Sequence, residues 1–199
     1  MAKNKHAANS SGGTINDEDF LKAEIAAGVS FENPEYLRLF EHTLQEVLKH
    51  MDFATFCDLG TGIGVFPHVV AESGRDAVGY DANRFHERYF KRHGSSGVSF
   101  RVADFTQGII GQYDLIACIE VAEHIPDEKL LPFLATLHNH GKALLFSSTS
   151  ERTDNDAGWG HINIKEQIEW VDLFFSLGWT LKATLDKPNN WTKLFVHNG

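Results

Sequence analysis

The chain has little cysteine: only Cys57 and Cys118 occur among its 199 residues. Each lies inside an apolar run, which favours two buried reduced thiols over a disulfide bridge. No apolar run approaches the roughly 18 residues that a membrane-spanning helix needs. The start, MAKNKHAANSSGG, has no apolar stretch typical of a secretory signal. These absences argue against a disulfide-stapled secreted protein and against a membrane span, and we expect a cytoplasmic protein.

Basic residues are also scarce, with 18 Lys and Arg against 27 Asp and Glu, for a formal net charge of −9. Proteins that bind nucleic acid through its phosphates generally present a basic surface. The charge balance therefore argues against nucleic acid as a partner. A local basic cluster occurs at Arg84, Arg88, Lys91 and Arg92. We interpret this cluster as the solvated face of a helix.

The chain does have the composition of one globular domain, with 42% hydrophobic and 23% charged residues. The polar residues 1–16 predict a disordered tail, and residues 17–199 a single domain. Its first part, residues 17–51, is expected to form two helices. The second of these has Asn33 as N-cap and Pro34 at the first helical position, followed by apolar residues at a helical period.

From residue 54 onward, short β-compatible runs alternate with helical patterns. Strands are predicted at 54–57, 77–80, 98–102, 113–121, 143–147, 180–185 and 193–196. Helices are predicted at 66–73, 83–93, 128–139 and 165–177. The last two strands are joined by the short KPNN turn and should be antiparallel neighbours. For residues 52–199 the pattern predicts an α/β, Rossmann-like core. It has a seven-stranded, mostly parallel sheet with the last strand antiparallel and helices on both faces.

A glycine-rich stretch, CDLGTGIGV, joins the first strand of this region to its helix. Its glycines are Gly60, Gly62 and Gly64. They allow a sharp turn and a close approach of the backbone to a ligand. The G-x-G-x-x-G pattern of dinucleotide-binding proteins fails, because its third glycine would fall at Val65. Asp58, two residues before the first glycine, is a poor neighbour for a pyrophosphate but suits an amine or a sulfonium.

Two more carboxylates follow at strand ends. Asp81 ends the second strand, where a carboxylate can accept hydrogen bonds from both hydroxyls of a ribose. Asp104 ends the third strand and is placed to face an adenine amino group. Because ligands of open α/β sheets bind beyond the carboxyl ends of the strands, the three signals together predict a nucleoside site. A tight turn with no ligand would not explain all three.

At these residues the chain resembles the class I S-adenosylmethionine-dependent methyltransferases, over about residues 50–199. The resemblance implies S-adenosylmethionine as cofactor, with the loop 58–64 around its methionine part, Asp81 at the ribose and Asp104 by the adenine. It also implies in-line attack of a nucleophile on the sulfonium methyl, in a site that works mainly by aligning the reactants. We expect oxygen as the nucleophile. Since no large cap domain is inserted, we expect a small or medium-sized acceptor.

The fourth strand runs into an E-x-x-E-H segment, which contains the catalytic candidates Glu123 and His124. In one interpretation, His124 is a general base. In another, a divalent metal, better Mn, Fe, Co or Zn than Mg, is held by Glu120, Glu123, His124 and His161. In a third, Glu120 seats the cofactor, Glu123 caps a turn and His124 bonds a backbone carbonyl. The segment resembles the ubiquinone-biosynthesis O-methyltransferases and the small-RNA 2′-O-methyltransferases, and the latter resemblance implies metal binding.

The segment 148–163 is long for a plain connection and leaves the fifth strand at the same edge of the sheet, which favours a binding or lid role. Trp159 and the third catalytic candidate, His161, are the expected contacts. Alternatively, Trp159 packs the loop down and His161 caps the next helix. Residues 20–36, including Phe31, are expected to fold over the cofactor. A non-catalytic cofactor-binding partner subunit remains the alternative function, and the oligomeric state stays open.

Overall fold

The computed structural model describes residues 7–8, 14–15, 17–150 and 159–197. Its strands are β1 (Ala7–Ala8), β2 (Thr14–Ile15), β3 (Thr55–Leu59), β4 (Asp76–Asp81), β5 (Val98–Val102), β6 (Leu115–Ile119), β7 (Ala143–Ser147), β8 (Trp179–Leu185) and β9 (Thr192–His197). Its helices are α1 (Asp17–Ala26), α2 (Pro34–Leu48), α3 (Val65–Glu72), α4 (Arg84–His93), α5 (Asp127–His140) and α7 (Gln167–Ser176). Two short 3-10 helices are η1 (Phe105–Gln107) and η2 (Ala122–His124).

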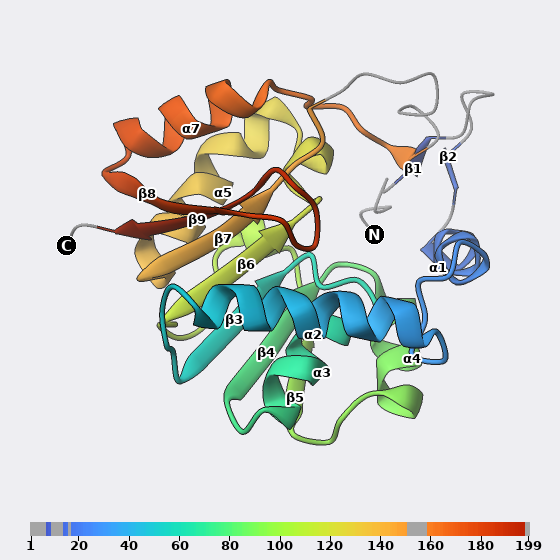
Figure 1. Cartoon of the computed structure of the whole chain (residues 1–199). Helices are drawn as coiled ribbons and strands as arrows, with labels where there is room; N and C mark the ends of the chain where they lie inside the picture. The colour runs from blue at the N-terminus through green and yellow to red at the C-terminus, as the bar shows by residue number, and fades with distance from the viewer. Residues whose placement is uncertain (1–6, 9–13, 16, 151–158, 198–199) are drawn as a thin grey trace.

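Seven strands form one sheet in the order β5-β4-β3-β6-β7-β9-β8 (Figure 1). Neighbours from β5 to β7 are parallel, whereas β9 is antiparallel to both β7 and β8. The predicted seven-stranded sheet with an antiparallel last strand is confirmed. The strand order reverses between β3 and β6, and this is the point at which open α/β sheets form a binding crevice.

Helices cover both faces of the sheet, as predicted (Figure 1). The two faces of β6 show why: Leu115 belongs to one buried cluster and Ile116 to the other, since successive side chains of a strand point to opposite faces. Phe66 of α3 packs in the first cluster and Phe174 of α7 in the second. Burying each such side chain stabilises the fold by roughly 1.5–3 kcal/mol. Packing on both faces therefore holds the strands whose carboxyl ends carry the site.

Most predicted boundaries agree with the structure to within a few residues. As predicted, α2 begins at Pro34, and the Asn33 side chain accepts a hydrogen bond from the Glu35 N–H at 3.0 Å. The first core strand is longer than predicted, because β3 includes Asp58, which pairs with both neighbouring strands. Tertiary pairing here overrides the low β-propensity of aspartate. In α5, Pro132 lies inside the helix, which still begins at Asp127.

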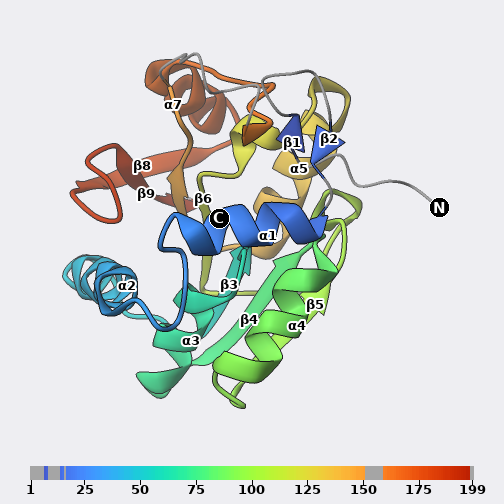
Figure 2. The same cartoon turned by 90° about the vertical axis from the view of Figure 1, so that its right-hand side faces the viewer.

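The predicted tail, residues 1–16, lies mostly outside the described residues, and β1 and β2 form a small antiparallel ladder within it. Cys57 and Cys118 are both buried and are not joined by a disulfide. Across the described ranges, no helix is both long enough and apolar enough to cross a bilayer. Helix α1 lies across the sheet at the carboxyl ends of β3 and β4 (Figure 2).

Candidate functional site

A crevice opens at the carboxyl ends of β3, β4 and β6. It has two adjoining parts, which share as lining residues Glu24, Gly60, Gly62 and Glu120. The α4-side part, about 170 Å³, is also lined by Asp81 and His124. The α2-side part, about 350 Å³, is also lined by Asp58, Tyr36 and Asn189. The loop after β3 therefore forms the floor between two chambers.

Two glycines of this loop are required for different reasons. Gly60 has φ +72°, and a Cβ there would lie 2.4 Å from Val121 Cγ2, so no side chain fits. Gly62 has φ +53°, but a Cβ there would meet only the Glu24 side chain, at 3.9 Å. Gly60 is thus fixed by packing, and Gly62 keeps the backbone accessible from the crevice. Gly64 immediately precedes α3, and a Cβ there would lie 2.5 Å from the Phe90 ring, while its contact with the ligand stays a prediction.

Asp58 lies near the end of β3 and faces the α2-side part. Its Oδ2 accepts a hydrogen bond from Thr61 Oγ1 at 2.7 Å. Burial raises the pKa of Asp58 to about 7, the Thr61 hydrogen bond opposes this shift, and the nearby Asp81 charge adds to it. A cationic group bound in the α2-side part would favour the ionised carboxylate.

Asp81 ends β4 with both oxygens oriented by hydrogen bonds. Oδ2 accepts from the Gly62 N–H at 2.9 Å, and Oδ1 accepts from the Asn83 N–H at 2.7 Å. Because each carboxylate oxygen can accept about two hydrogen bonds, Asp81 can accept further donors from the α4-side part. It lies where the sequence placed it, at the wall of the crevice.

Behind Asp81 lies a buried histidine that sequence reasoning did not identify. His86 Nδ1 is 3.2 Å from Asp81 Oδ1, and His86 Nε2 is 2.6 Å from Glu24 Oε2. Burial would lower the pKa of His86, but the hydrogen bonds and charges of Asp81 and Glu24 raise it to about 10. No local pattern signals this contact, because Glu24 and His86 are 62 residues apart.

Asp104, predicted to face an adenine, is held by partners within the protein. Its Oδ1 accepts from both the N–H and the Oγ1 of Thr106 at the start of η1, and its Oδ2 pairs with Lys129 at 2.6 Å. These partners hold the carboxylate as a helix cap, and the following residue, Phe105, lines the crevice instead. Asp104 itself lines neither part of the crevice, and its contact with an adenine stays a prediction.

Glu120 is the one described non-glycine residue with positive φ, at 53°. A left-handed backbone costs an ordinary residue roughly 1–2 kcal/mol, and it places this side chain between the two parts of the crevice. Its Oε1 accepts hydrogen bonds from Ser147 Oγ at 2.7 Å and from Trp191 Nε1 and Asn189 Nδ2, each at 3.1 Å. The β8–β9 turn, predicted only as a turn, thus reaches the site.

Three of the four predicted metal ligands converge. One donor atom each from Glu123, His124 and His161 lies within 4.8 Å of the others. Backbone hydrogen bonds align the two segments that carry them, since Ile162 N–H and Asn163 N–H donate to the Glu123 carbonyl at 2.8 and 2.9 Å. Glu120 is not in this group, so the four-ligand hypothesis is corrected to three.

Within this cluster, the Glu123 carboxyl and the His124 ring have different hydrogen-bond partners. The Glu123 carboxyl is 1% exposed and accepts a hydrogen bond from Ser148 Oγ at 3.0 Å. Burial, together with repulsion from Glu120, raises the pKa of Glu123 to about 8. His124 Nδ1 is 3.2 Å from the Gly160 carbonyl oxygen. A proton on Nδ1 that bonds this carbonyl leaves the lone pair on Nε2, the tautomer that a ligand or a base requires.

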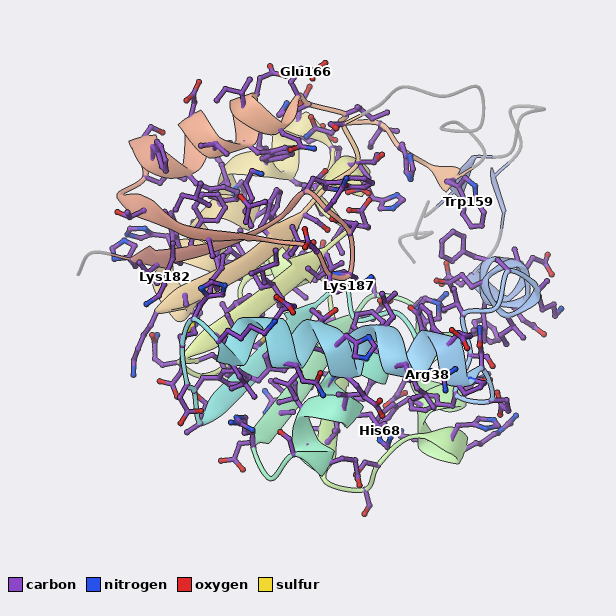
Figure 3. All side chains as sticks on the ribbon, viewed as in Figure 1. Arg38, His68, Trp159, Glu166, Lys182 and Lys187 are labelled. Carbon is purple, nitrogen blue, oxygen red and sulfur yellow. The ribbon has the colours of Figure 1, made fainter. Side chains whose placement is uncertain are left out.

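Only some of the residues that were predicted to cover the crevice do so. Phe20 of α1 lines the α4-side part, and its ring lies edge-on to that of Trp159, with centroids 6.1 Å apart. Figure 3 shows Trp159 on the same side of the molecule as α1. Phe31 packs instead against His68. His161 does not cap α7, which begins after Glu166. The rest of the predicted loop, residues 151–158, lies outside the described residues.

A family model described as a methyltransferase domain matches residues 32–184. The ubiquinone biosynthesis O-methyltransferase of Bordetella avium (strain 197N) is 27% identical over 123 residues, which are 52% of this chain and 51% of that protein. The chain thus spans about half the length of this relative.

Two solved structures share the fold. The magnesium protoporphyrin IX methyltransferase of Synechocystis PCC 6803, with bound S-adenosylmethionine, has a TM-score of 0.61 at 15% identity and covers 94% of this chain and 86% of its own. The methyltransferase domain of bacterial CtHen1-CN has a TM-score of 0.58 at 18% identity, covering 82% and 98%. This chain belongs to the methyltransferase domain family and has the fold of the class I S-adenosylmethionine-dependent methyltransferases.

Proposed function

We propose that the chain transfers the methyl group of S-adenosylmethionine to an oxygen of a small or medium-sized acceptor. The observation that carries this proposal is the pair of carboxylates, the buried Asp58 and the half-buried Asp81, on either side of the Gly60–Gly62 floor. Asp81 can accept hydrogen bonds from ribose hydroxyls in the α4-side part. Asp58 offers a counter-charge to the cofactor's amine in the α2-side part.

We expect the acceptor to bind in the α4-side part of the crevice, where His124 and Glu120 both line the wall. The name of the Bordetella avium relative supports oxygen as the acceptor atom. A formal net charge of −9 disfavours a polyanionic acceptor.

A divalent metal fits the Glu123–His124–His161 cluster. One carboxylate and two imidazoles form a donor set suited to Mn, Fe, Co or Zn, and their convergence within 4.8 Å leaves further positions for acceptor oxygens. A metal there would lower the pKa of an acceptor hydroxyl and orient it toward the methyl group.

Without a metal, His124 remains the group that can take the acceptor proton. In both versions, the chain's own residues do the same work. Asp58 and Asp81 hold the cofactor, the Gly160 carbonyl and the His161 ring position His124, and Phe20 and Trp159 exclude water.

The binding experiment is calorimetry with S-adenosylmethionine, S-adenosylhomocysteine and NAD. We expect both adenosyl compounds to bind and NAD not to bind, because Asp58 stands where a pyrophosphate would have to approach. Binding of NAD alone would overturn the proposal. At 100 times its dissociation constant a ligand adds about 2.7 kcal/mol of stability, so a melting experiment gives an independent readout.

The metal is tested by titrating the purified protein with Co²⁺ and recording its visible absorption, which reports coordination directly. Saturable binding that is lost in Glu123→Gln supports the ligand set. An exposed acid on α5 provides the matched control, Glu128→Gln. Equal Co²⁺ spectra in both variants would contradict the proposed metal site, and His124 would then act as a base without a metal.

A further inference from the structure

Helix α1 covers the crevice but is attached to the rest of the molecule by few groups. Leu21 is the only buried residue along its length. Two polar contacts join it to the start of α4: Asn83 Nδ2 donates to the Asp17 carbonyl at 2.9 Å, and Glu24 meets His86. Figure 2 shows α1 beside α4, across the ends of β3 and β4. Because only Leu21 ties α1 into the hydrophobic core, the helix can open locally at low cost.

The Glu24–His86 contact is buried, unlike the ion pairs elsewhere on α1. The His86 side chain is 4% exposed and that of Glu24 15%, whereas Lys22 and Glu18 are 64% and 52% exposed. Exposed pairs contribute roughly 0–1 kcal/mol. The single buried pair is therefore the strongest polar contact between α1 and the body.

His86 lies between two carboxylates: it shares a hydrogen bond with Glu24, and it meets Asp81 at ion-pair distance without an aligned hydrogen bond. Nε2 lies 2.6 Å from Glu24 and Nδ1 lies 3.2 Å from Asp81. The other polar neighbour within hydrogen-bonding range is the Asn83 amide, 3.5 Å from Nε2. Two carboxylates at 2.6 and 3.2 Å favour the protonated ring, and they raise the pKa of His86 above its ordinary value.

The same geometry places Glu24 over the cofactor loop. Glu24 lines both parts of the crevice, and its Oε1 would be 3.9 Å from a Cβ on Gly62. The Gly62 N–H in turn bonds Asp81. Without a cation between them, Asp81 and Glu24 would repel each other across the same small space.

We propose that His86 is a positioning residue whose ring orients Asp81 and fastens Glu24, so that α1 closes as a lid over the bound cofactor. The inference rests on the proposed cofactor site, since Asp81 is the carboxylate assigned to the ribose. It predicts that α1 governs how fast the cofactor leaves, whereas the affinity of the open site resides in Asp58 and Asp81.

The first test is hydrogen exchange of the α1 backbone amides in the unliganded protein, comparing wild type with Glu24→Gln. The glutamine keeps the length and one hydrogen bond but removes the charge. We expect exchange of α1 to become about tenfold faster, because bonds to charged groups are stronger than neutral ones. Glu18→Gln, on the same helix but exposed, is the matched control and should exchange as wild type does. Equal exchange in Glu24→Gln and wild type would overturn the lid.

The second test is stopped-flow kinetics with S-adenosylhomocysteine. For Glu24→Gln we expect dissociation about tenfold faster, with association changed less than about twofold, since an unfastened lid mainly affects escape. A change confined to association, or no change, would contradict the proposal. If wild type itself does not bind this compound, the proposed function fails, while the exchange experiment still decides whether α1 is fastened by Glu24.

The third readout is the His86 ring itself, followed by NMR of histidine-labelled protein. We expect a protonated ring at pH 8 in wild type and a lower titration midpoint in Glu24→Gln. A neutral His86 ring at pH 8 would overturn the role of its charge. This comparison needs no substitution of the buried His86 itself, because Glu24→Gln leaves the His86 ring in place.

Discussion

The two sides of the crevice are built in different ways. On the β3–β4 side, Asp58 and Asp81 are parts of strands, and short hydrogen bonds from Thr61, Gly62 and Asn83 orient their oxygens. On the β6–β7 side, the groups of the Glu123–His124–His161 cluster lie beyond the strand ends, aligned by backbone bonds between two loops. The first side is organised before any ligand arrives. The second brings together donor atoms of the kind that bind a divalent cation.

The largest effect is expected from removing the ribose carboxylate. Asp81→Ala should weaken S-adenosylhomocysteine binding by roughly 100-fold or more, because two hydrogen bonds to a charged group are lost. Calorimetry measures the change. Asp76→Ala, exposed at the opposite end of β4, should bind as wild type does. Unchanged affinity in Asp81→Ala would remove Asp81 from the site.

The next largest effect is expected at the metal cluster. His161→Gln should lower the affinity for Co²⁺ tenfold to 100-fold, a loss typical of changes to metal sites. Its affinity for S-adenosylhomocysteine should stay within about twofold, since the β3–β4 side is organised independently and distant changes add without coupling. A parallel loss of both affinities would show that the two sides form one unit and would break the comparison.

The rigidity of the β3–β4 side is tested by two glycines of similar conformation. Gly60→Ala adds both a strained left-handed backbone and a Cβ 2.4 Å from Val121, whereas Gly74→Ala, at φ +86°, meets no atom within 4 Å. We expect Gly60→Ala to lower the free energy of unfolding by about 2–5 kcal/mol and Gly74→Ala by about 1–2 kcal/mol. Equal losses in urea unfolding would mean that the loop yields.

The smallest effect is a pH dependence. The folded-state pKa of Asp58, about 7, lies above its ordinary value of 3.8, so ionisation is disfavoured in the folded protein. The contribution of Asp58 to the stability of the unliganded protein should therefore be largest below about pH 4. It should be lost as the pH rises to about 7. Asp58→Asn should flatten this part of the melting profile. A profile of unchanged slope would show that the pKa of Asp58 is the same in the folded and unfolded protein.

How far the sequence could predict the molecule follows from the range of the contacts involved. Strand and helix alternation, the Asn33 cap and the loop before α3 depend on neighbouring residues, and these predictions agree with the structure. Asp104 and Glu120 were placed at the right strand ends. However, their oxygens bond side chains 25 and 69 residues away, Lys129 and Asn189, which no local pattern specifies.

The same limit explains the residues that were missed. Glu24 and His86 meet only because α1 folds back across the sheet, and Phe20 replaces Phe31 in the crevice for the same reason. The carboxyl-edge rule located the site, but it could not say which helix covers it.

The place of β9 has a consequence for how the molecule is completed during synthesis. β9 follows β8 in the chain yet inserts between β7 and β8, and the turn before it supplies Asn189 and Trp191 to Glu120. Until that hairpin emerges from the ribosome, β7 is an unpaired edge open to aggregation. A nascent chain stalled near residue 186 would have its glycine-rich loop but would lack Asn189 and Trp191, which donate hydrogen bonds to Glu120 at the crevice.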